Sequence, residues 1–383
     1  MLTRLAPSTS VSPVAADLAR SIGLVLCGLT LIFAITVPLD ARAVLIATGD
    51  GTGNTTAPAA DPGFDNVGRI VVWTGVYVGN GWVITANHVG DQPIVLLGVT
   101  YDPIAGSRVR FQNPDLSYAD LIVYKLQSKP PLPDLQITDS APSFNTLVTM
   151  IGNGHDRGAA TTYSGNDGWL WAAQRTLRWG TNRIVDDDEF VLDTQSFVTE
   201  FDDLAGPPPG QHEAELVNGD SGGAAFTGSG GSAELIGILF ARAPLIGQPA
   251  NTSIFGDFGV IVDLFAYRTA ILAIIEQPDC SDGLDDDGDG LTDFPDDPGC
   301  TDALDTDERG APFQCDNGID DDGDTFFDYP DDNGCASPFD DSENTALVPT
   351  GLPGAVLLGL LALIMVIRAS GSTASNALRS QID

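Results

Sequence analysis

Basic residues are scarce in this 383-residue chain, and cysteine and histidine are rarer still. Lys and Arg together number 17 against 53 Asp and Glu, so the formal net charge is −36. A chain this acidic repels the phosphates of nucleic acids, which excludes nucleic acid as a partner bound through a basic surface. Residues 44–279 contain no cysteine, so a domain in this range stands without disulfides. The hydrophobic content of 43% nevertheless supplies a core.

The negative charge is concentrated in one part of the chain. Residues 280–344 contain 23 of the 53 acidic residues and a single basic residue, Arg309. This shift in composition predicts a domain boundary near residue 279. The expected organisation is a signal peptide (1–43), a globular domain (44–279), an acidic segment (280–344), an apolar segment (346–367) and a short tail (368–383).

The first 43 residues have the features of a secretory signal. Arg4 and Arg20 precede an apolar run over residues 22–39, and small residues stand at Ala41 and Ala43. We therefore expect export, with cleavage after Ala43. The alternative is an uncleaved N-terminal membrane anchor, because the apolar run is long for a signal.

A second apolar run lies near the other end of the sequence. Residues 346–367 are 22 consecutive residues without a charge, enough for a helix to cross a hydrocarbon layer of about 30 Å. Arg368 and Arg379 follow the run, which favours a cytoplasmic C-terminus and an outer location for the rest. The run also resembles bacterial C-terminal sorting signals. We expect a membrane-anchored protein of the periplasm or cell surface, and retention or processing of the anchor stays open.

Residues 44–279 have the pattern of many short strands separated by Gly, Pro, Asn and Asp, which predicts an all-β domain. One amphipathic segment, residues 264–276, is predicted to be a helix that closes the domain. The predicted strands are residues 69–76, 81–85, 94–100, 121–126, 147–151, 183–192, 223–226, 234–240 and 259–262.

Three short motifs carry candidate chemistry. His88 ends GWVITANH, Asp120 lies near the start of ADLIVYKL, and Ser221 lies in NGDSGG. A serine hydroxyl needs an imidazole base to become a nucleophile, and the imidazole needs a carboxylate to fix its tautomer. The amide groups of Gly219 and Ser221 could stabilise a tetrahedral oxyanion. Each motif alone could be structural, but together they predict acyl transfer.

In this order and context the motifs resemble those of the trypsin-like serine endopeptidases, over roughly residues 44–276. The resemblance implies two six-stranded β-barrels with His88, Asp120 and Ser221 as a catalytic triad in the crevice between them. It implies peptide-bond hydrolysis without a cofactor and a protein or peptide substrate. The two remaining histidines, His155 and His212, lack such contexts and are expected at the surface.

The resemblance also implies a specificity pocket. The family selects substrates through the position six residues before the nucleophile, which is Glu215 here, and through a stretch that corresponds to Phe240, Ala241 and Arg242. A carboxylate at Glu215 would favour basic substrate residues, but Arg242 could neutralise it. We therefore do not predict a trypsin-like preference.

Activation is implied in the same way. Members of the family insert a free N-terminal amine beside the Asp that precedes the nucleophile, which is Asp220 here. Val44 would be the first residue after signal cleavage. Our hypothesis is that removal of the signal itself frees the activating amine.

The four cysteines after residue 279 belong to a repeat. The segments from Cys280 to Cys300 and from Cys315 to Cys335 align with a period of 35 residues. Pairing within each repeat is the simplest of the three connectivities, and it agrees with an oxidising compartment.

Both repeats carry Asp residues at the spacing of calcium loops and resemble thrombospondin type 3 repeats. The second has Thr325 where the first has Gly290 at the sixth position. The alternative is a disordered acidic spacer. The expected ligands are Asp285, Asp287, Asp289, Leu291, Asp293 and Asp296 in the first repeat and Asp320, Asp322, Asp324, Asp328 and Asp331 in the second.

The sequence therefore predicts an exported, membrane-tethered serine endopeptidase with calcium-binding repeats. A different class stays open, namely a surface adhesion or binding protein whose protease-like domain is inactive. Labelling by a serine-directed fluorophosphonate separates the two, because only an activated hydroxyl reacts.

Overall fold

The computed structural model describes residues 44–202, 212–310 and 313–344. The predicted signal (1–43), apolar segment (346–367) and tail (368–383) lie outside these residues. Within the described ranges no helix is both long and apolar enough to cross a membrane. The chain divides into two units, Met1–Asp40 and Ala41–Asp383, and every described residue belongs to the second.

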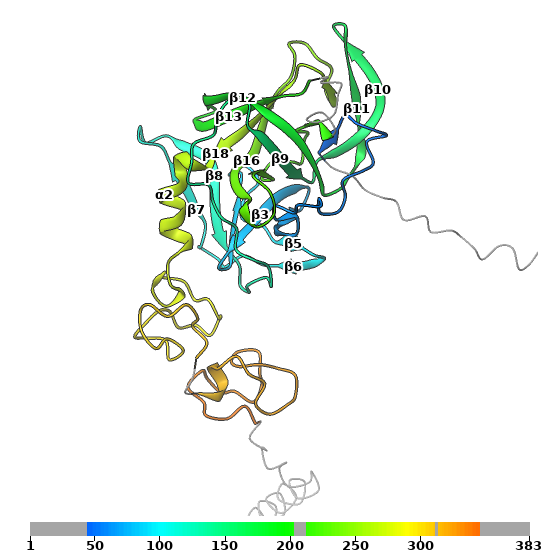
Figure 1. Ribbon diagram of the computed structural model, residues 1–383. Coiled ribbons are helices and arrows are strands. Elements are labelled where there is room, and N and C mark those ends of the chain that lie inside the picture. Colours follow the sequence, from blue (N-terminus) through cyan, green and yellow to red (C-terminus); the bar gives the residue numbers. More distant parts are fainter. Residues whose placement is uncertain (1–43, 203–211, 311–312, 345–383) are drawn as a thin grey trace, which may run out of the picture. The chain divides into compact units, whose positions relative to one another are not determined.

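Two large β-sheets form most of residues 44–279, which we call the β domain (Figure 1). One sheet has seven strands, and the other is a closed barrel of six. In sheet order, the first consists of β6 (Val99–Tyr101), β5 (Ile94–Leu96), β2 (Val67–Ile70), β3 (Trp73–Gly79), β4 (Trp82–Thr85), β8 (Tyr118–Lys125) and β7 (Val109–Gln112). In barrel order, the second consists of β12 (Arg178–Val191), β13 (Thr194–Glu200), β18 (Phe258–Asp263), β16 (Glu234–Ala243), β15 (Ala224–Thr227) and β9 (Leu147–Gly152).

The all-β prediction is confirmed for this domain. The prediction of two six-stranded barrels is wrong for the first sheet, which has seven strands. Residues 94–100, predicted as one strand, form a hairpin in which Leu96 pairs with Val99. Leu97 (φ 50°) and Gly98 (φ 83°) at its turn are both left-handed, as a two-residue hairpin of the tightest kind requires. The hairpin adds β6 as a seventh strand.

The predicted strand at residues 69–76 is also two strands, β2 and β3, which pair as a hairpin. The chain reverses at Val71 (φ 54°) and Val72, which are both exposed. A β-branched residue is unfavourable in a left-handed conformation, so the residue types gave no turn signal here.

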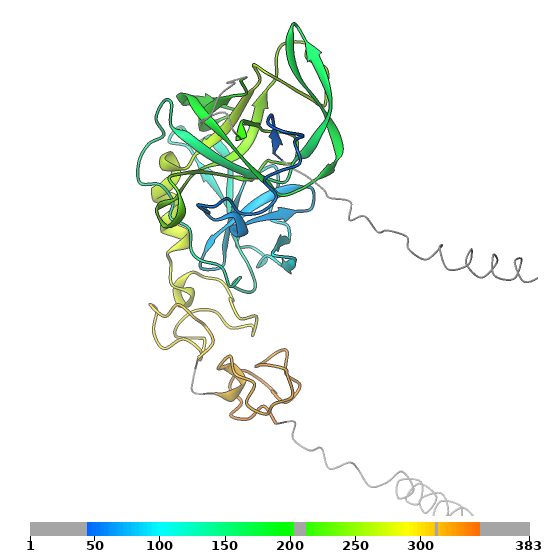
Figure 2. The ribbon, with the colours of Figure 1, turned by 45° about the vertical axis from the view of Figure 1, so that its right-hand side comes forward.

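Several strands were not predicted, among them β13 and a long hairpin that contains β10 (His155–Tyr163) and β11 (Asn166–Arg175). The hairpin, drawn in green in Figure 2, joins β17 (Thr252–Ile254) in a three-stranded sheet. Most of its side chains are half-buried or exposed, so its sequence lacks the apolar alternation that marks a strand against a core. A last pair of short strands is formed by β1 (Leu45–Ile46) and β14 (Ala214–Glu215).

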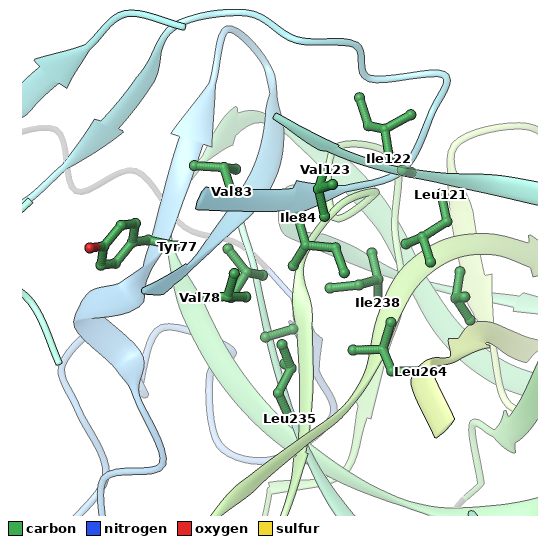
Figure 3. Packing of buried hydrophobic residues seen from close by; sticks show 14 of the residues in the cluster. Tyr77, Val78, Val83, Ile84, Leu121, Ile122, Val123, Leu235, Ile238 and Leu264 are labelled. Carbon is green, nitrogen blue, oxygen red and sulfur yellow. The ribbon is translucent and has the colours of Figure 1, made fainter. Parts of the chain in front are cut away.

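The main hydrophobic core joins the two large sheets. Ile84 and Leu121 from the first sheet belong to the same buried cluster as Ile238 from β16 and Leu264 from the C-terminal helix (Figure 3). All four side chains are completely buried. A core shared in this way holds the sheets against each other without a disulfide and fixes the loops at their junction.

The predicted helix is confirmed as α2 (Leu264–Ile275). Its N-terminus is capped by Asp263, whose side chain accepts a hydrogen bond from the Phe265 amide at 2.9 Å. Tyr267 and Ile271 face the core. The remaining short helical turns are η1 (Phe64–Asn66), η3 (Gly230–Ser232), η4 (Asp279–Ser281) and η5 (Gln314–Asp316).

The acidic segment forms the two predicted repeats, which we call the first repeat (residues 280–314) and the second repeat (residues 315–344). Disulfides join Cys280 to Cys300 and Cys315 to Cys335. The described residues of both repeats contain no β-strand and no helix longer than one short turn. The loop-rich prediction and the pairing within each repeat are confirmed.

The first repeat is bound to the β domain through a lysine. Lys125, at the end of β8, is 1% exposed, and its Nζ lies 2.9 Å from Asp279 and 2.5 Å from both Asp282 and Asp286. Lys129 adds a bond of 2.6 Å to the other oxygen of Asp279. This contact was not predicted, because the sequence does not indicate which basic residue meets which acids.

Candidate active site

His88 and Asp120 are joined by two hydrogen bonds. Nδ1 of His88 lies 2.7 Å from Oδ2 of Asp120, and the His88 amide donates to Oδ1 at 2.9 Å. The strands β4 and β8 are paired, with Thr85 opposite Ile122, so the residues that follow one strand meet the start of the other. This geometry orients the imidazole and leaves its Nε2 for another partner.

The electrostatics of Asp120 favour the charged carboxylate. Burial raises the pKa of the Asp120 carboxyl, but the hydrogen bonds and charge of His88 and the charge of Arg110 together bring it below its ordinary value. The Asp120 amide is itself held by Thr194 Oγ1 at 2.8 Å. An ionised Asp120 can stabilise a protonated His88.

Ser221 lies in a loop that is docked on β3. Thr74 donates from its amide to the Ser221 carbonyl at 3.0 Å and from its hydroxyl to the Gly219 carbonyl at 2.8 Å. Gly222 (φ 87°) must be glycine, because a Cβ there would lie 1.9 Å from the Thr74 carbonyl oxygen. The loop is thus pressed against the same strand whose first residue, Trp73, contacts His88 edge-on at 5.6 Å.

No hydrogen bond joins Ser221 to His88 among the described residues. Ser221 lines a cavity together with Trp73, the residue whose ring contacts His88. The structure therefore pairs His88 with Asp120 directly, and Trp73 lies next to His88 and lines the cavity of Ser221.

Two amides beside Ser221 have no acceptor. The N–H groups of Gly219 and Ser221 make no hydrogen bond within the described part of the chain, whereas those of Asp220, Gly222 and Gly223 donate to backbone carbonyls. Unengaged N–H groups on the serine itself and on the residue two before it are donors of the kind that an oxyanion requires.

Asp220 is completely buried and surrounded by amide donors. Its Oδ1 accepts from the Gly154 amide at 2.6 Å and its Oδ2 from the Val217 amide at 2.8 Å. The Val44 amide is a third donor to this carboxylate. Burial raises the pKa of Asp220 to about 6, despite these bonds and the charge of Arg175. The structure therefore brings Val44, itself 1% exposed, to Asp220.

The predicted specificity residues surround a cavity of about 230 Å³ beside Ser221. Phe240, Ala241 and Arg242 line it, whereas Glu215 is completely buried behind Arg242. Arg242 Nε lies 3.6 Å from Glu215, and the guanidinium also binds Asp257. Burial raises the pKa of Glu215 to about 8, although the charge of Arg242 lowers it.

Two neighbours of Arg242 were not predicted. Trp171 stands 5.1 Å from the Arg242 guanidinium and comes from the unpredicted hairpin. Asp257 follows β17 as one of many loop acids, with no sequence signal that it would meet Arg242.

The two remaining histidines are more enclosed than predicted. His155 is half-buried, stacks on Trp171 at 5.6 Å, and has its Nε2 2.7 Å from an Arg175 nitrogen. Burial lowers the pKa of His155. His212 is also half-buried and packs on Trp179 at 4.5 Å. Both residues keep part of their surface exposed, while an aromatic side chain packs against each ring.

Both acidic repeats bring three Asp carboxylates together. The ligand atoms of Asp285, Asp287 and Asp289 lie within 4.8 Å of one another, and so do those of Asp320, Asp322 and Asp324. Thr325 (φ 83°) adopts the left-handed conformation of its counterpart Gly290 (φ 92°).

The other predicted ligands are placed differently. Asp293 accepts from the Gly283 amide at 3.1 Å, and Asp328 accepts from the Asn317 and Gly318 amides at 2.8 Å. Leu291 donates its amide to Asp289 at 2.6 Å. Asp296 and Asp331 are exposed. Their neighbours Asp297 and Asp332 are each 2% exposed.

Comparison with known proteins identifies the family of the β domain. The family model described as Trypsin matches residues 64–261. No curated protein matches the sequence. Similar solved structures include neuropsin, a serine protease of mouse brain (17% identity, 58% of this chain and 97% of that chain, TM-score 0.40). Others are kallikrein-related peptidase 10 in complex with Zn²⁺ (16%, 57% and 99%, 0.38) and a mutant of human heparin binding protein (15%, 59% and 97%, 0.41).

Proposed function

The chain belongs to the trypsin family, and from this we propose that it is a serine endopeptidase that cleaves protein or peptide substrates through His88, Asp120 and Ser221. The observation that carries the proposal is the pair of hydrogen bonds between Asp120 and His88. They orient the imidazole and leave its Nε2 without a hydrogen bond among the described residues, and the N–H groups of Gly219 and Ser221 are likewise unengaged there.

In the proposed reaction, Ser221 Oγ attacks the carbonyl carbon of the scissile peptide bond and its proton passes to His88 Nε2. The amides of Gly219 and Ser221 donate to the resulting oxyanion, and each such donor contributes about 3–4 kcal/mol to transition-state stabilisation. His88 then gives the proton to the leaving amine, which departs and leaves an acyl group on Ser221. Water, deprotonated by His88, releases the acid and restores the hydroxyl.

We propose that the enzyme is activated by cleavage after Ala43. The cleavage would convert the Val44 amide, which already donates to Asp220, into a charged amine. An amine beside this buried carboxylate supplies the positive charge that it lacks, which stabilises the loop that carries Gly219 and Ser221.

A cavity with a free carboxylate would favour a Lys or Arg side chain of the substrate. The proposed substrate cavity does not expose one. Arg242 stands between the cavity and Glu215, and it is also bound to Asp257. Trp73, Trp171 and Phe240 make the wall largely apolar. We therefore propose that apolar side chains fit it better than basic ones at neutral pH.

The proposed setting is extracytoplasmic. We propose export through the signal at residues 1–43, membrane tethering through residues 346–367, and calcium binding in both repeats, with no nucleic acid partner. The disulfides in both repeats are consistent with an oxidising compartment.

A fluorophosphonate probe tests the catalytic proposal. The chain cleaved after Ala43 should be labelled, and Ser221→Ala and His88→Ala should each abolish labelling, since one removes the nucleophile and the other its base. Ser164→Ala, at an exposed turn, is the matched control and should label normally. A folded wild-type chain that resists the probe would favour the alternative of an inactive, protease-like binding protein.

A further inference from the structure

The first repeat contains a cluster of carboxylates, and several of their oxygens accept no hydrogen bond from the described residues. In the loop, Asp285 accepts from the amides of Gly288 and Gly290 at 2.8 and 3.1 Å. Asp289 uses Oδ1 to accept from Leu291, but its Oδ2 is buried and has no hydrogen-bond partner. The side chain of Asp289 is 8% exposed.

A fourth carboxylate comes from the end of the same repeat. Asp297 accepts from the Gly299 amide at 2.7 Å through Oδ1, while its Oδ2 is buried without a partner. A carboxylate oxygen of Asp297 lies within 4.8 Å of one of Glu308, which itself accepts hydrogen bonds from the loop amides of Asp286 and Asp293. Its neighbour Asp296 is exposed.

A fifth carboxylate belongs to the second repeat. Asp316, next to Cys315, is 1% exposed and lies within hydrogen-bonding reach of the Asp287 carboxyl in the first repeat. Its Oδ2 lies close to Gly299, 3.0 Å from where a Cβ on that glycine would stand, and has no donor. Two carboxylates within hydrogen-bonding reach, such as those of Asp316 and Asp287, repel each other unless a proton or a cation lies between them.

The repeats supply almost no positive charge of their own. Arg309 is their single basic residue, and it is exposed and donates to the Asp287 carbonyl at 3.2 Å. The other acidic cluster of this region, formed by Asp279, Asp282 and Asp286, receives Lys125. Buried carboxylates without such a partner are costly. Three unpartnered oxygens among five carboxylates therefore point to a cation from solution.

We propose that a single Ca²⁺ bound in the first loop takes Asp297 and Asp316 as ligands together with Asp285, Asp287 and Asp289, and so joins the two repeats. Ca²⁺ accepts about six to eight oxygen ligands in flexible geometry, which suits such a mixed set. The inference rests on the proposed calcium binding and extends it, because Asp316 makes the site span both repeats.

The second loop provides an internal comparison. Asp332 takes the place of Asp297, with a buried and unpartnered Oδ2. The residue one period of 35 after Asp316 is Gly351 in the sequence, which has no carboxylate to offer. The second loop should therefore bind Ca²⁺ more weakly than the first, since affinity rises with the number of charged ligands.

Calcium titration of the full chain by calorimetry tests the ligand set. Asp316→Asn and Asp297→Asn should each weaken the tighter binding event by about tenfold or more. Asp296→Asn, the exposed neighbour of Asp297, is the matched control and should leave both events unchanged. If Asp316→Asn behaves like Asp296→Asn, the inference is wrong although calcium binding stands. A wild-type chain that binds no calcium refutes calcium binding itself.

Hydrogen exchange tests the bridge separately. In a chain carrying Asp320→Asn, which disables the second loop, Ca²⁺ should slow amide exchange around Cys315 and Asp316. Adding Asp285→Asn should remove this protection, because the ion is then no longer held by the first loop. Unchanged amide exchange in peptides from β4 serves as the control that the β domain is intact in each variant. Protection that survives Asp285→Asn, or that never develops with calcium, overturns the bridge.

Discussion

The β domain and the two acidic repeats both bury carboxylates, and they differ in where the compensating charge comes from. In the β domain several of these groups have a partner of the same domain. Asp120 is bound by His88, Asp257 by Arg242, and Asp220 by the amides of Gly154, Val217 and Val44. The cost of burial is offset internally.

In the repeats, several buried oxygens have no partner. Oδ2 of Asp289, Asp297, Asp316 and Asp332 accepts no hydrogen bond. The repeats have no large apolar core either, and a disulfide closes each of them. The comparison teaches that an apolar core allows a domain to place its own counter-charges, whereas a small acidic unit depends on cross-links and external cations.

Lys125 stands at the junction of the two kinds of structure. It belongs to the β domain, yet its ammonium binds Asp282 and Asp286 of the first repeat as well as Asp279, the last residue of the β domain. It occupies the position that a metal ion would take among Asp279, Asp282 and Asp286, whose ligand oxygens lie within 4.8 Å of one another.

The largest effect is expected for Lys125→Met. Three buried carboxylates would lose their cation, and breaking such a pair costs about 3–5 kcal/mol. Urea unfolding of the full chain, followed by the fluorescence of Trp82 close to Lys125, should show this loss in the absence of calcium. Millimolar Ca²⁺ should restore part of it, because a metal ion can replace the ammonium.

Lys129→Met is the matched control for this experiment. Lys129 also binds Asp279, but its side chain is 45% exposed, so its loss should cost no more than about 1 kcal/mol. Equal effects of the two substitutions would contradict the distinction between a buried and an exposed partner.

A similarly large effect is expected when the Val44 amine is moved away from Asp220. A mature chain extended by one alanine ahead of Val44 would displace the charged amine from the buried carboxylate. Since breaking a buried pair costs about 3–5 kcal/mol, peptide hydrolysis should fall by about 100-fold or more.

Asp220→Asn serves as the second arm of a double-variant cycle. It should reduce hydrolysis to a similar extent, and combining it with the extension should add little. Unchanged hydrolysis by the extended chain would refute activation through Val44.

A smaller effect concerns pH and Glu215. Its pKa is raised to about 8, so the carboxyl is mostly neutral at pH 7 and mostly ionised at pH 9. The ratio of kcat/KM for a lysine-containing substrate to that for a leucine-containing substrate should therefore rise between these pH values, by at most roughly tenfold. Because both substrates use the same enzyme, the titration of His88 cancels in the ratio.

Glu215→Gln removes the ionisable group and should make the ratio independent of pH. A pH-dependent ratio that persists in this variant would assign the effect to another group.

The smallest effect distinguishes the two repeats. Thr325 is held in a left-handed conformation that costs a residue other than glycine about 1 kcal/mol. Thr325→Gly should strengthen the weaker calcium-binding event by about fivefold. Gly290→Thr in the first loop should weaken the tighter event by a similar factor, since open space around Gly290 leaves only the backbone cost. No change in either variant would contradict this account.

Local sequence was a good guide wherever local chemistry decides the structure. The helix after Asp263 and the cysteine pairs follow from capping, periodicity and repeat spacing, and the structure confirms them. The residues His88, Asp120 and Ser221 could be selected from their motifs, although their catalytic roles remain a prediction. Turns at Val71 and Leu97 could not be predicted, because neither residue type favours a reversal.

Contacts between distant segments escaped prediction for a different reason. Asp296 and Asp297 are adjacent and chemically identical, and only the packed fold turns Asp297 inward. The pairing of Asp316 with Asp287 likewise depends on how one repeat packs on the other.

By itself, the sequence determined that this protein has an all-β domain without disulfides, a capped C-terminal helix, and two acidic repeats that each contain a cysteine pair. These properties depend on composition, periodicity and spacing, which act over short stretches of chain. Only the tertiary structure decided that Arg242 stands in front of Glu215, that Lys125 binds the first repeat, and which carboxylates are left without a partner. Charges interact through space, so their balance is set by which segments the fold brings together.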